Sequence, residues 1–386
     1  MNTILGELGK NPKFCEYIKN IKNKKSPIAI SGLTDVGMIQ MLSATKEFVK
    51  KPICIITYNE IQARKMIEDL KYFTDKIIYI PKKDIVTYNY VAESKDLPYE
   101  RIEVLSKIYD NKNMIIVTTI EAVQQKIVAK EELYKNVLDF KIGQRWKIEE
   151  IKQKLVDLGY VRYELIDGRG EFSVRGGIID ISISETTGVR IELWGDEIDS
   201  IRYFNIISQR STSQIDKMKI FPAHEYILEN SVEDVCNNLK EKIYEGKRLE
   251  TLENDIEVIR NGDYLSKIDR YFNSFYKNQN TILDYLSEKY LIFIDEKSKL
   301  KARSESIRQD TENLEKSLIE KEKIIPDSLQ NTLEYNNVED LLKDKQTIFI
   351  EKLNNTTTSN MQKYNLHFRQ LNYFKSETGL LIEDIK

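Results

Sequence analysis

The chain has 386 residues, of which 41% are hydrophobic and 31% charged, a balance typical of a globular protein with room for two or three lobes. Its formal net charge is −3, whereas a dedicated DNA-binding domain is usually basic, so nucleic acid is not the expected main partner. The sequence has no apolar stretch approaching roughly 18 residues and no signal-peptide core, which predicts a cytoplasmic protein without a membrane segment.

The first third of the chain has the pattern of an α/β lobe. Residues 2–23 predict one helix that mixes apolar and basic side chains. Buried strands are predicted for the continuous apolar runs at 27–31, 53–57, 77–80 and 114–118. Helices are predicted between these strands, near 36–50, 59–73 and 97–110. Strands that alternate with helices indicate a parallel sheet with right-handed crossovers.

The first strand leads into a loop with the G-x-x-x-x-G spacing of a phosphate-binding loop, set by Gly32 and Gly37. An active loop continues with a Lys for the β- and γ-phosphates and a Ser or Thr for Mg²⁺. Met38 and Ile39 stand at those two positions, and Asp35 adds a negative charge within the loop. The loop amides could still face an anion, or the glycines could form only a strand-to-helix turn. In either case this degenerate loop is not expected to hydrolyse ATP.

A second lobe is expected to begin near residue 140, where the pattern changes. A helix over 147–158 is followed by strand-like runs that alternate and turn at glycines, at 160–166, 171–183, 189–194 and 197–206. This pattern predicts an antiparallel lobe of about 80 residues that ends near Pro222.

Strand periodicity divides the side chains of this lobe between two faces. The inward set is apolar and consists of Phe172, Val174, Ile191 and Leu193. The outward set consists of Glu171, Ser173, Arg175, Arg190, Glu192 and Trp194. Arg and Trp are suited to protein interfaces, although an ordinary solvated sheet face would give the same pattern.

The last part of the chain is predicted to be mostly helical up to residue 288. A buried strand at 290–294 then ends in Asp295 and Glu296, in the form of a degenerate Walker B motif or of a solvated strand end. A helix over 297–323, a strand at 347–351 and a polar loop at 354–360 follow. Residues 376–386 stop within an amphipathic pattern, which predicts a piece of a longer protein.

The predicted fold class is therefore α/β: a parallel-sheet core like that of P-loop proteins but degenerate, with an inserted antiparallel α+β lobe and a helical lobe. The predicted divisions are an α/β lobe, an inserted β-rich lobe, a helical lobe that returns a core strand, and a linker, at 1–138, 139–222, 223–372 and 373–386.

Metal and disulfide chemistry are not predicted. The cysteines Cys15, Cys54 and Cys236 are scattered and contain no C-x-x-C pair, and His224 and His367 lie far apart. No catalytic residue is assigned to this chain, and no cofactor is expected in it.

The most specific sequence runs resemble the UvrB-homology module of the bacterial transcription-repair coupling factors. They are G-E-F-S-V-R-G-G-I-I-D-I at 170–181, R-I-E-L-W-G-D-E-I-D-S-I-R at 190–202 and S-Q-R-S at 208–211. Two further runs, at 101–105 and 115–122, are also similar to that family, and the resemblance covers essentially the whole chain.

UvrB itself is the nearest alternative, which would make the chain an ATPase and DNA-binding repair subunit. UvrB keeps an intact phosphate-binding loop and inserts a long β-hairpin that clamps one DNA strand. Here Tyr90 and Arg101 are separated by too few residues for such a hairpin. Damage verification on DNA is therefore not expected.

The resemblance implies that the β-rich lobe binds UvrA. The residues assigned to this surface are Arg162, Phe172, Arg175, Arg190 and Glu192. Arg162 and Arg175 match UvrA-contacting arginines of UvrB, whereas Ser173 stands where UvrB has another Arg.

The resemblance also implies partners for the complete protein. RNA polymerase, DNA, ATP and Mg²⁺ would be bound by domains outside these residues, and a C-terminal domain would cover the β-rich lobe until RNA polymerase is engaged. Two other functions remain open from the residues alone, a nucleotide-hydrolysing enzyme and a direct DNA binder.

Overall fold

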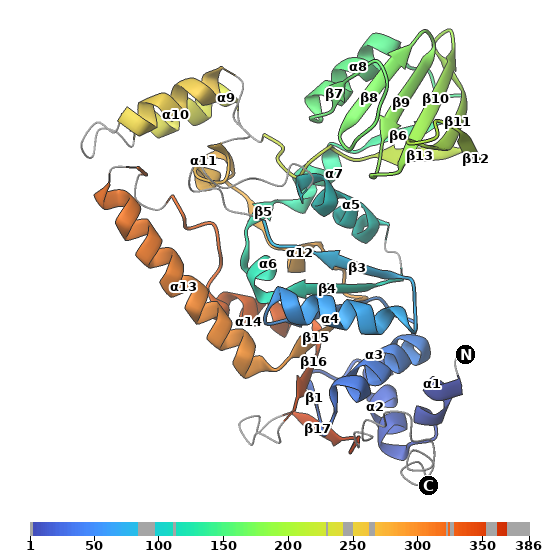
Figure 1. Ribbon diagram of the computed structural model, residues 1–386, viewed down its shortest axis with the longest axis vertical. Helices are drawn as coiled ribbons and strands as arrows, with labels where there is room; N and C mark the ends of the chain where they lie inside the picture. Colours follow the sequence, from blue (N-terminus) through green and yellow to red (C-terminus); the bar gives the residue numbers. More distant parts are fainter. Residues whose placement is uncertain are drawn as a thin grey trace, which may run out of the picture.

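The computed structural model describes residues 3–83, 97–110, 113–228, 231–241, 250–261, 267–321, 323–324, 328–352 and 361–368. These residues form a parallel α/β core, a β-rich lobe that stands apart from it, and helices that flank both (Figure 1). The segment predicted to be too short for a DNA-clamping hairpin lies mostly outside the described residues, as do the polar loop at 354–360 and the end of the chain.

The core is built on a seven-stranded sheet in the order β17-β1-β16-β15-β2-β4-β3, in which every neighbouring pair is parallel. In that order the strands are Gln362–Asn365, Ile28–Ser31, Gln346–Glu351, Leu291–Asp295, Ile53–Thr57, Ile115–Thr119 and Ile77–Ile80. The sequence prediction of an α/β fold with a parallel sheet is confirmed. Strands β15 and β16 come late in the chain but lie between β1 and β2, so the β-rich lobe and the helical lobe are inserted into one core.

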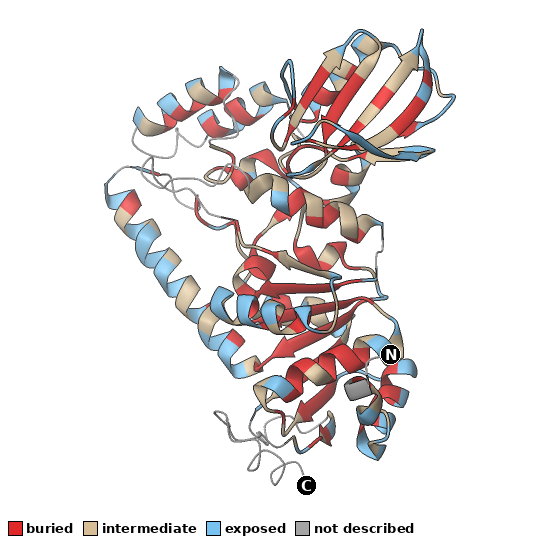
Figure 2. Ribbon diagram, turned by 45° about the vertical axis from the view of Figure 1, so that its right-hand side comes forward, coloured by how far each residue is buried: buried red, intermediate tan, exposed pale blue. Residues whose placement is uncertain are grey.

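Helices cover both faces of this sheet. One face packs against α1 (Thr3–Leu8), α2 (Pro12–Lys22), α3 (Asp35–Val49) and α4 (Glu60–Lys71). The other packs against α5 (Leu97–Tyr109), α6 (Ile120–Gln124), α12 (Ile282–Tyr285), α13 (Lys297–Glu320) and α14 (Tyr335–Lys343). The central strands are buried along their whole length, while much of α13 is exposed (Figure 2).

The prediction of a single helix over 2–23 is wrong. Helix α1 ends at Leu8, and α2 begins at Pro12 with Asn11 as its N-cap. Proline is tolerated in the first turn of a helix but disrupts its interior, so it separates the two segments.

Above the core lies the β-rich lobe, whose main sheet has six strands in the order β12-β11-β10-β9-β8-β7. In that order they are Ser211–Ile215, Glu197–Asn205, Thr187–Trp194, Ile178–Ser182, Glu171–Arg175 and Val161–Arg162. A ribbon of β6 (Leu138–Lys141) and β13 (Lys217–Ile220), together with α8 (Ile148–Asp157), covers one face and closes a core around Phe140, Phe172 and Ile191. The lobe is antiparallel except at its edge, because β7 runs parallel to β8.

Two predicted strands of this lobe differ from the observed ones. The run predicted over 171–183 is a hairpin of β8 and β9, which turns at Gly176, where the backbone has a φ of +60° that glycine adopts without strain. The run predicted over 160–166 ends as a strand at Arg162. Beyond it the chain folds over the sheet, where Ile166 is buried with Phe204 and Ile206.

The remaining elements form the helical lobe and its contacts. They are α7 (Lys130–Lys135), α9 (Val232–Glu241), α10 (Glu250–Arg260) and α11 (Phe272–Phe275), with a short antiparallel pair of β5 (Ile127–Val128) and β14 (Gln279–Asn280). Helices α9 and α10 pack beside one another through Val235, Leu239 and Ile256.

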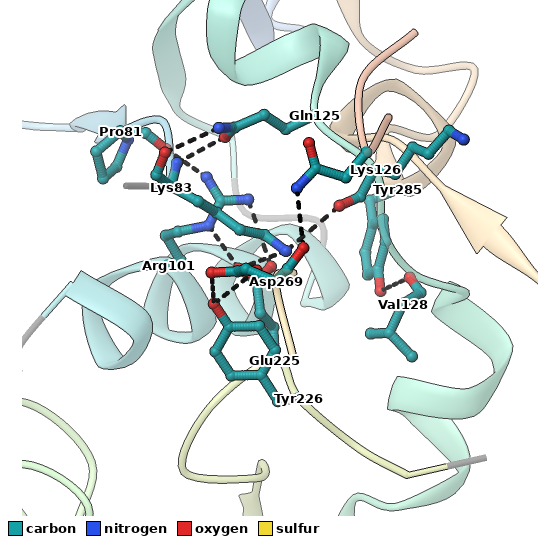
Figure 3. A network of polar contacts seen from close by, with 11 residues as sticks. Pro81, Lys83, Arg101, Gln125, Lys126, Val128, Glu225, Tyr226, Asp269 and Tyr285 are labelled. Atoms are coloured by element: carbon teal, nitrogen blue, oxygen red, sulfur yellow. Dashed lines mark hydrogen bonds and ion pairs between the residues drawn. The ribbon is translucent and has the colours of Figure 1, made fainter. Parts of the chain in front are cut away.

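A buried charge network joins the three lobes (Figure 3). Arg101 of α5 donates from Nε to Glu225 Oε1 at 2.8 Å and from Nη2 to Oε2 at 3.3 Å, and Lys83 Nζ lies 3.6 Å from Oε1. Arg101 is 2% exposed and Glu225 1%. Burial alone would raise the pKa of the Glu225 carboxyl, but Arg101 and Lys83 outweigh it and hold that pKa below its usual value. The pair is therefore charged inside the protein.

The same network reaches the helical lobe. Tyr226 follows Glu225 and donates from its hydroxyl to Asp269 at 3.3 Å, while Lys83 lies over the rings of Tyr226 and Phe272. The chain leaving the β-rich lobe is thus held at one buried point against both other parts.

His224, which precedes Glu225 in the chain, should make the stability of the protein depend on pH. Burial lowers its pKa from 6.5 to about 4, and its ring fills the space that a side chain at Gly159 would need. The unfolded state therefore binds a proton more tightly, so stability is lost as the pH falls from about 6.5 toward 4. Between pH 7.5 and 5.0 this residue should contribute a loss of about 2 kcal/mol, measured by urea unfolding. His224→Gln should flatten this part of the pH dependence, and an unchanged slope would contradict the assignment.

Candidate functional site

The outer face of the β-rich lobe carries most of the residues assigned to partner binding. Strand register places Ser173, Asp180, Arg190 and Arg202 in one row across β8, β9, β10 and β11. Arg175 and Glu192 lie on the same face, two residues further along β8 and β10. The opposite face is the hydrophobic core of the lobe.

Asp180 is the centre of this face. It is only 1% exposed. Arg190 donates two hydrogen bonds to its carboxylate, from Nε to Oδ1 at 2.7 Å and from Nη2 to Oδ2 at 2.9 Å. Arg175 Nη2 donates to the same Oδ2 at 2.8 Å. Two of the arginines assigned to the partner-binding surface therefore converge on one buried carboxylate.

A second pair lies beside the first. Glu192 Oε2 accepts from Arg202 Nη2 at 2.8 Å and from the Ser200 hydroxyl at 2.9 Å. Arg190 also lies over the ring of Phe204, 4.8 Å from its centroid, and Phe204 packs on Gly188, where a Cβ would collide with the ring. The charged side chains of this face are thus held in place by one another and by a small apolar cluster beside them on the same face.

Trp194 is an exposed anchor at the end of β10. Its side chain is 86% exposed, the largest exposed fraction among the large hydrophobic residues of the described chain. It precedes the turn at Gly195, which has a φ of +63°, and faces Glu197 across the hairpin. It lies on the same face as Arg175, whose side chain is 50% exposed, and Trp and Arg are both enriched among the residues that dominate protein interfaces.

Two of the predicted residues lie on the core side of the sheet, and a third lies on the outer face but is buried. Arg162 is exposed but pairs with Phe172, which places it on the core side of the sheet edge, opposite Arg175. Phe172 is fully buried, as its inward direction predicted, so it supports the sheet rather than presenting a surface. Ser173 is on the outer face but is 1% exposed.

Asp180 and Arg202 belong to this cluster, although the sequence pattern alone does not assign them to it. Asp180 alternates with Ile179 and Ile181, a period that points it outward. What the period does not give is the pairing of strands, and only the register shows that Arg190 stands opposite Asp180.

The degenerate phosphate-binding loop lies at the end of β1. Gly32 has a φ of +72°, and helix α3 begins at Asp35 with Thr34 as its cap, two residues before the second glycine. Gly37 donates its N–H to the Thr34 hydroxyl at 3.0 Å, and Met38 donates to the Thr34 carbonyl at 2.8 Å. Met38 and Ile39 are buried in the core. The backbone N–H groups of Gly37 and Met38 are therefore engaged within the turn.

Asp35 occupies the start of this helix as an internal anion. Lys352 and Lys65 approach its two carboxylate oxygens at 2.8 and 2.7 Å, and their hydrogen bonds lower its pKa to about 2. A carboxylate at a helix N-terminus takes the position that suits a bound anion.

The segment after β17 covers the same loop. Phe368 donates its backbone N–H to the Gly32 carbonyl at 2.8 Å, and its ring lies where a Cβ on Gly37 would be 2.6 Å away. Asn365 approaches Gly32 in the same way. Protein side chains therefore fill the surroundings of both glycines.

Strand β15 ends at Asp295 and is followed by Glu296, one strand away from β1 in the sheet. Asp295 is buried, Thr57 donates to its Oδ2 at 2.8 Å, and burial raises its pKa despite that hydrogen bond. Glu296 has a φ of +57° and pairs with Lys299. Among the residues that the structure describes, no group of three or more His, Cys, Asp or Glu side chains is arranged to hold a metal ion.

The β-rich lobe is similar to a known family of interaction domains. Residues 138–226, which include the whole charged face, match the family described as the UvrB interaction domain. The lobe is thus similar to that domain, and it is carried on a parallel α/β core.

Longer matches extend to the rest of the chain. It is 26% identical over 342 residues to the transcription-repair-coupling factor of Bacillus subtilis, and 28% identical over 334 residues to that of Staphylococcus aureus strain MRSA252. These matches cover 85% and 82% of the chain but only 29% and 28% of the two relatives. The resemblance to transcription-repair coupling factors predicted from the sequence is confirmed. Within the described residues, none of the helices has the length and apolar character needed to cross a bilayer.

Proposed function

We propose that this chain is the UvrA-recruiting module of a transcription-repair coupling factor, acting in transcription-coupled nucleotide excision repair. The observation that carries the proposal is that the outer face of the lobe matching the UvrB interaction domain presents Arg175, Arg190 and Trp194 on one side of the sheet. Charge-assisted hydrogen bonds from such arginines to a partner carboxylate are each worth about 1.5–3 kcal/mol.

Arg175→Ala is the direct test of this surface. Its side chain is 50% exposed, and Arg190 still holds Asp180 bidentately without it, so the lobe should remain folded. Pull-down and titration with purified UvrA should show binding weakened tenfold or more. An unchanged affinity with a folded variant would overturn the assignment of Arg175 to the interface.

We further propose that this chain does not hydrolyse ATP. The proposal is supported by the burial of Met38 and Ile39, by the Asp35 ion pairs and by Phe368 beside Gly37. A phosphate-release assay with and without DNA should detect no turnover above that of a buffer control. ATP turnover that Asp295→Asn abolishes would favour the alternative, a UvrB-like ATPase.

We propose the remaining partners for the complete protein and not for this chain. RNA polymerase, DNA, ATP and Mg²⁺ would act through other domains, no cofactor is proposed for this chain, and a C-terminal domain would cover the UvrA-binding face. The cytoplasmic location also stays a proposal. If the covering domain regulates the face, this chain alone should bind UvrA without RNA polymerase.

A further inference from the structure

We infer that Asp180 is a positioning residue of the UvrA-binding face: it makes no contact with the partner but holds Arg175 and Arg190 as one preorganised receptor for a partner carboxylate. This inference rests on the proposed function and deepens it, because it states how the arginines are set and which chemistry they select. The partner segment it fits is acidic, with an apolar side chain placed to meet Trp194.

The burial of Asp180 excludes it as a contact. At 1% exposure, below both guanidinium groups, it offers no surface to another molecule. Its neighbour across the strand pair, Ser173, is equally buried, and the Ser173 hydroxyl has no hydrogen-bond partner among the described residues. Within the described part of the chain, the hydrogen bonds to this carboxylate all come from the two arginines.

Asp180 holds the two arginines in place but leaves some of their N–H donors available to a partner. A guanidinium has five N–H donors, and Arg175 gives Asp180 one hydrogen bond while Arg190 gives it two. Arg190 is held further by the Phe204 ring, and its side chain is 17% exposed against 50% for Arg175. Both can donate outward to a planar carboxylate while their inner edges stay bound to Asp180.

A substitution at Asp180 distinguishes a positioning role from a purely electrostatic effect on binding. Asp180→Asn makes the face more positive by one charge, so electrostatic attraction alone predicts tighter binding of an acidic partner and faster association. Loss of preorganisation predicts the opposite sign, because free arginines must be ordered on binding. The two explanations thus differ in the direction of the change.

The experiment measures association and dissociation rates of purified UvrA with the 386-residue chain. For Asp180→Asn we expect Kd to rise about fivefold, mostly through faster dissociation. Glu185→Gln is the matched control, because it removes the same charge from a 79%-exposed side chain in the hairpin that joins β9 to β10. It should leave Kd within about twofold. In an Arg175→Ala background the effect of Asp180→Asn should shrink. Tighter binding of Asp180→Asn, or an effect equal to that of Glu185→Gln, would overturn the inference.

A measurement on the free wild-type chain covers the case in which Asp180→Asn does not fold. Arginine-selective nitrogen NMR should show restricted guanidinium rotation for Arg175 and Arg190 before any partner is added. Free rotation of both groups would overturn the inference. If UvrA does not bind the wild-type chain, the proposed function fails, and the NMR result still decides whether Asp180 positions the arginines.

Discussion

Arg101→Met is expected to lower the free energy of unfolding by about 3–5 kcal/mol, the largest stability effect predicted for this chain. Arg101 is 2% exposed, and its loss leaves the buried Glu225 carboxylate with Lys83 at 3.6 Å as its nearest cation. Removing one partner of a buried ion pair is costly because the remaining charge keeps its desolvation penalty. Urea unfolding at pH 7.5 measures the change.

The control for this prediction removes both charges. Arg101→Met combined with Glu225→Gln leaves no uncompensated carboxylate, so the double variant should be more stable than Arg101→Met alone. A single variant as stable as the wild type would show that the network does not hold the lobes together.

Trp194→Ala is expected to weaken UvrA binding by at least tenfold, and by about thirtyfold if Trp194 is a central anchor worth roughly 2 kcal/mol. The side chain is 86% exposed, so truncating it removes little from the folded lobe and acts on the partner complex alone. Calorimetric titration with UvrA measures the loss, and the melting temperature should stay within a few degrees of the wild type.

Ile207→Ala is the matched control for Trp194→Ala. Ile207 is an apolar side chain with 80% exposure. It follows the last residue of β11, whereas Trp194 faces Glu197, the first residue of that strand, so the two side chains lie at opposite ends of β11. Its removal should leave UvrA affinity within about twofold. Equal losses for the two variants would mean that general apolar exposure, not the Trp194 site, drives binding.

Much of the fold could be predicted because its signals are local. Most strands of the parallel sheet are continuous apolar runs such as Ile53–Thr57, and their predicted ranges agree with the observed ones to within a residue or two. The two edge strands differ: β3 is mostly half-buried where a buried strand is predicted, and the polar strand β17 is not predicted at all. The break between α1 and α2 follows from Pro12, a local signal that the amphipathic pattern around it concealed. The position of β15 and β16 inside the sheet could not be predicted, because it depends on contacts between segments far apart in the chain.

The outward-facing residues of the candidate site could be predicted from the sequence, but the ion pairs between them could not. Alternation placed Arg175, Arg190 and Trp194 outward, and the structure agrees. Register decides the rest, since it brings Asp180 under both arginines and turns Arg162 to the other side of the sheet edge. The cover that Phe368 forms over Gly37 comes from a segment more than 300 residues away, which no local pattern indicates.

The central claim is that the charged face of the β-rich lobe recruits UvrA. Calorimetric titration of purified UvrA with the wild-type chain and with an Arg175→Ala/Trp194→Ala double variant tests it most directly. The account predicts saturable binding by the wild type and binding at least a hundredfold weaker by a double variant with an unchanged circular dichroism spectrum. Equal affinity for the two proteins, or no binding by the wild type, would contradict it.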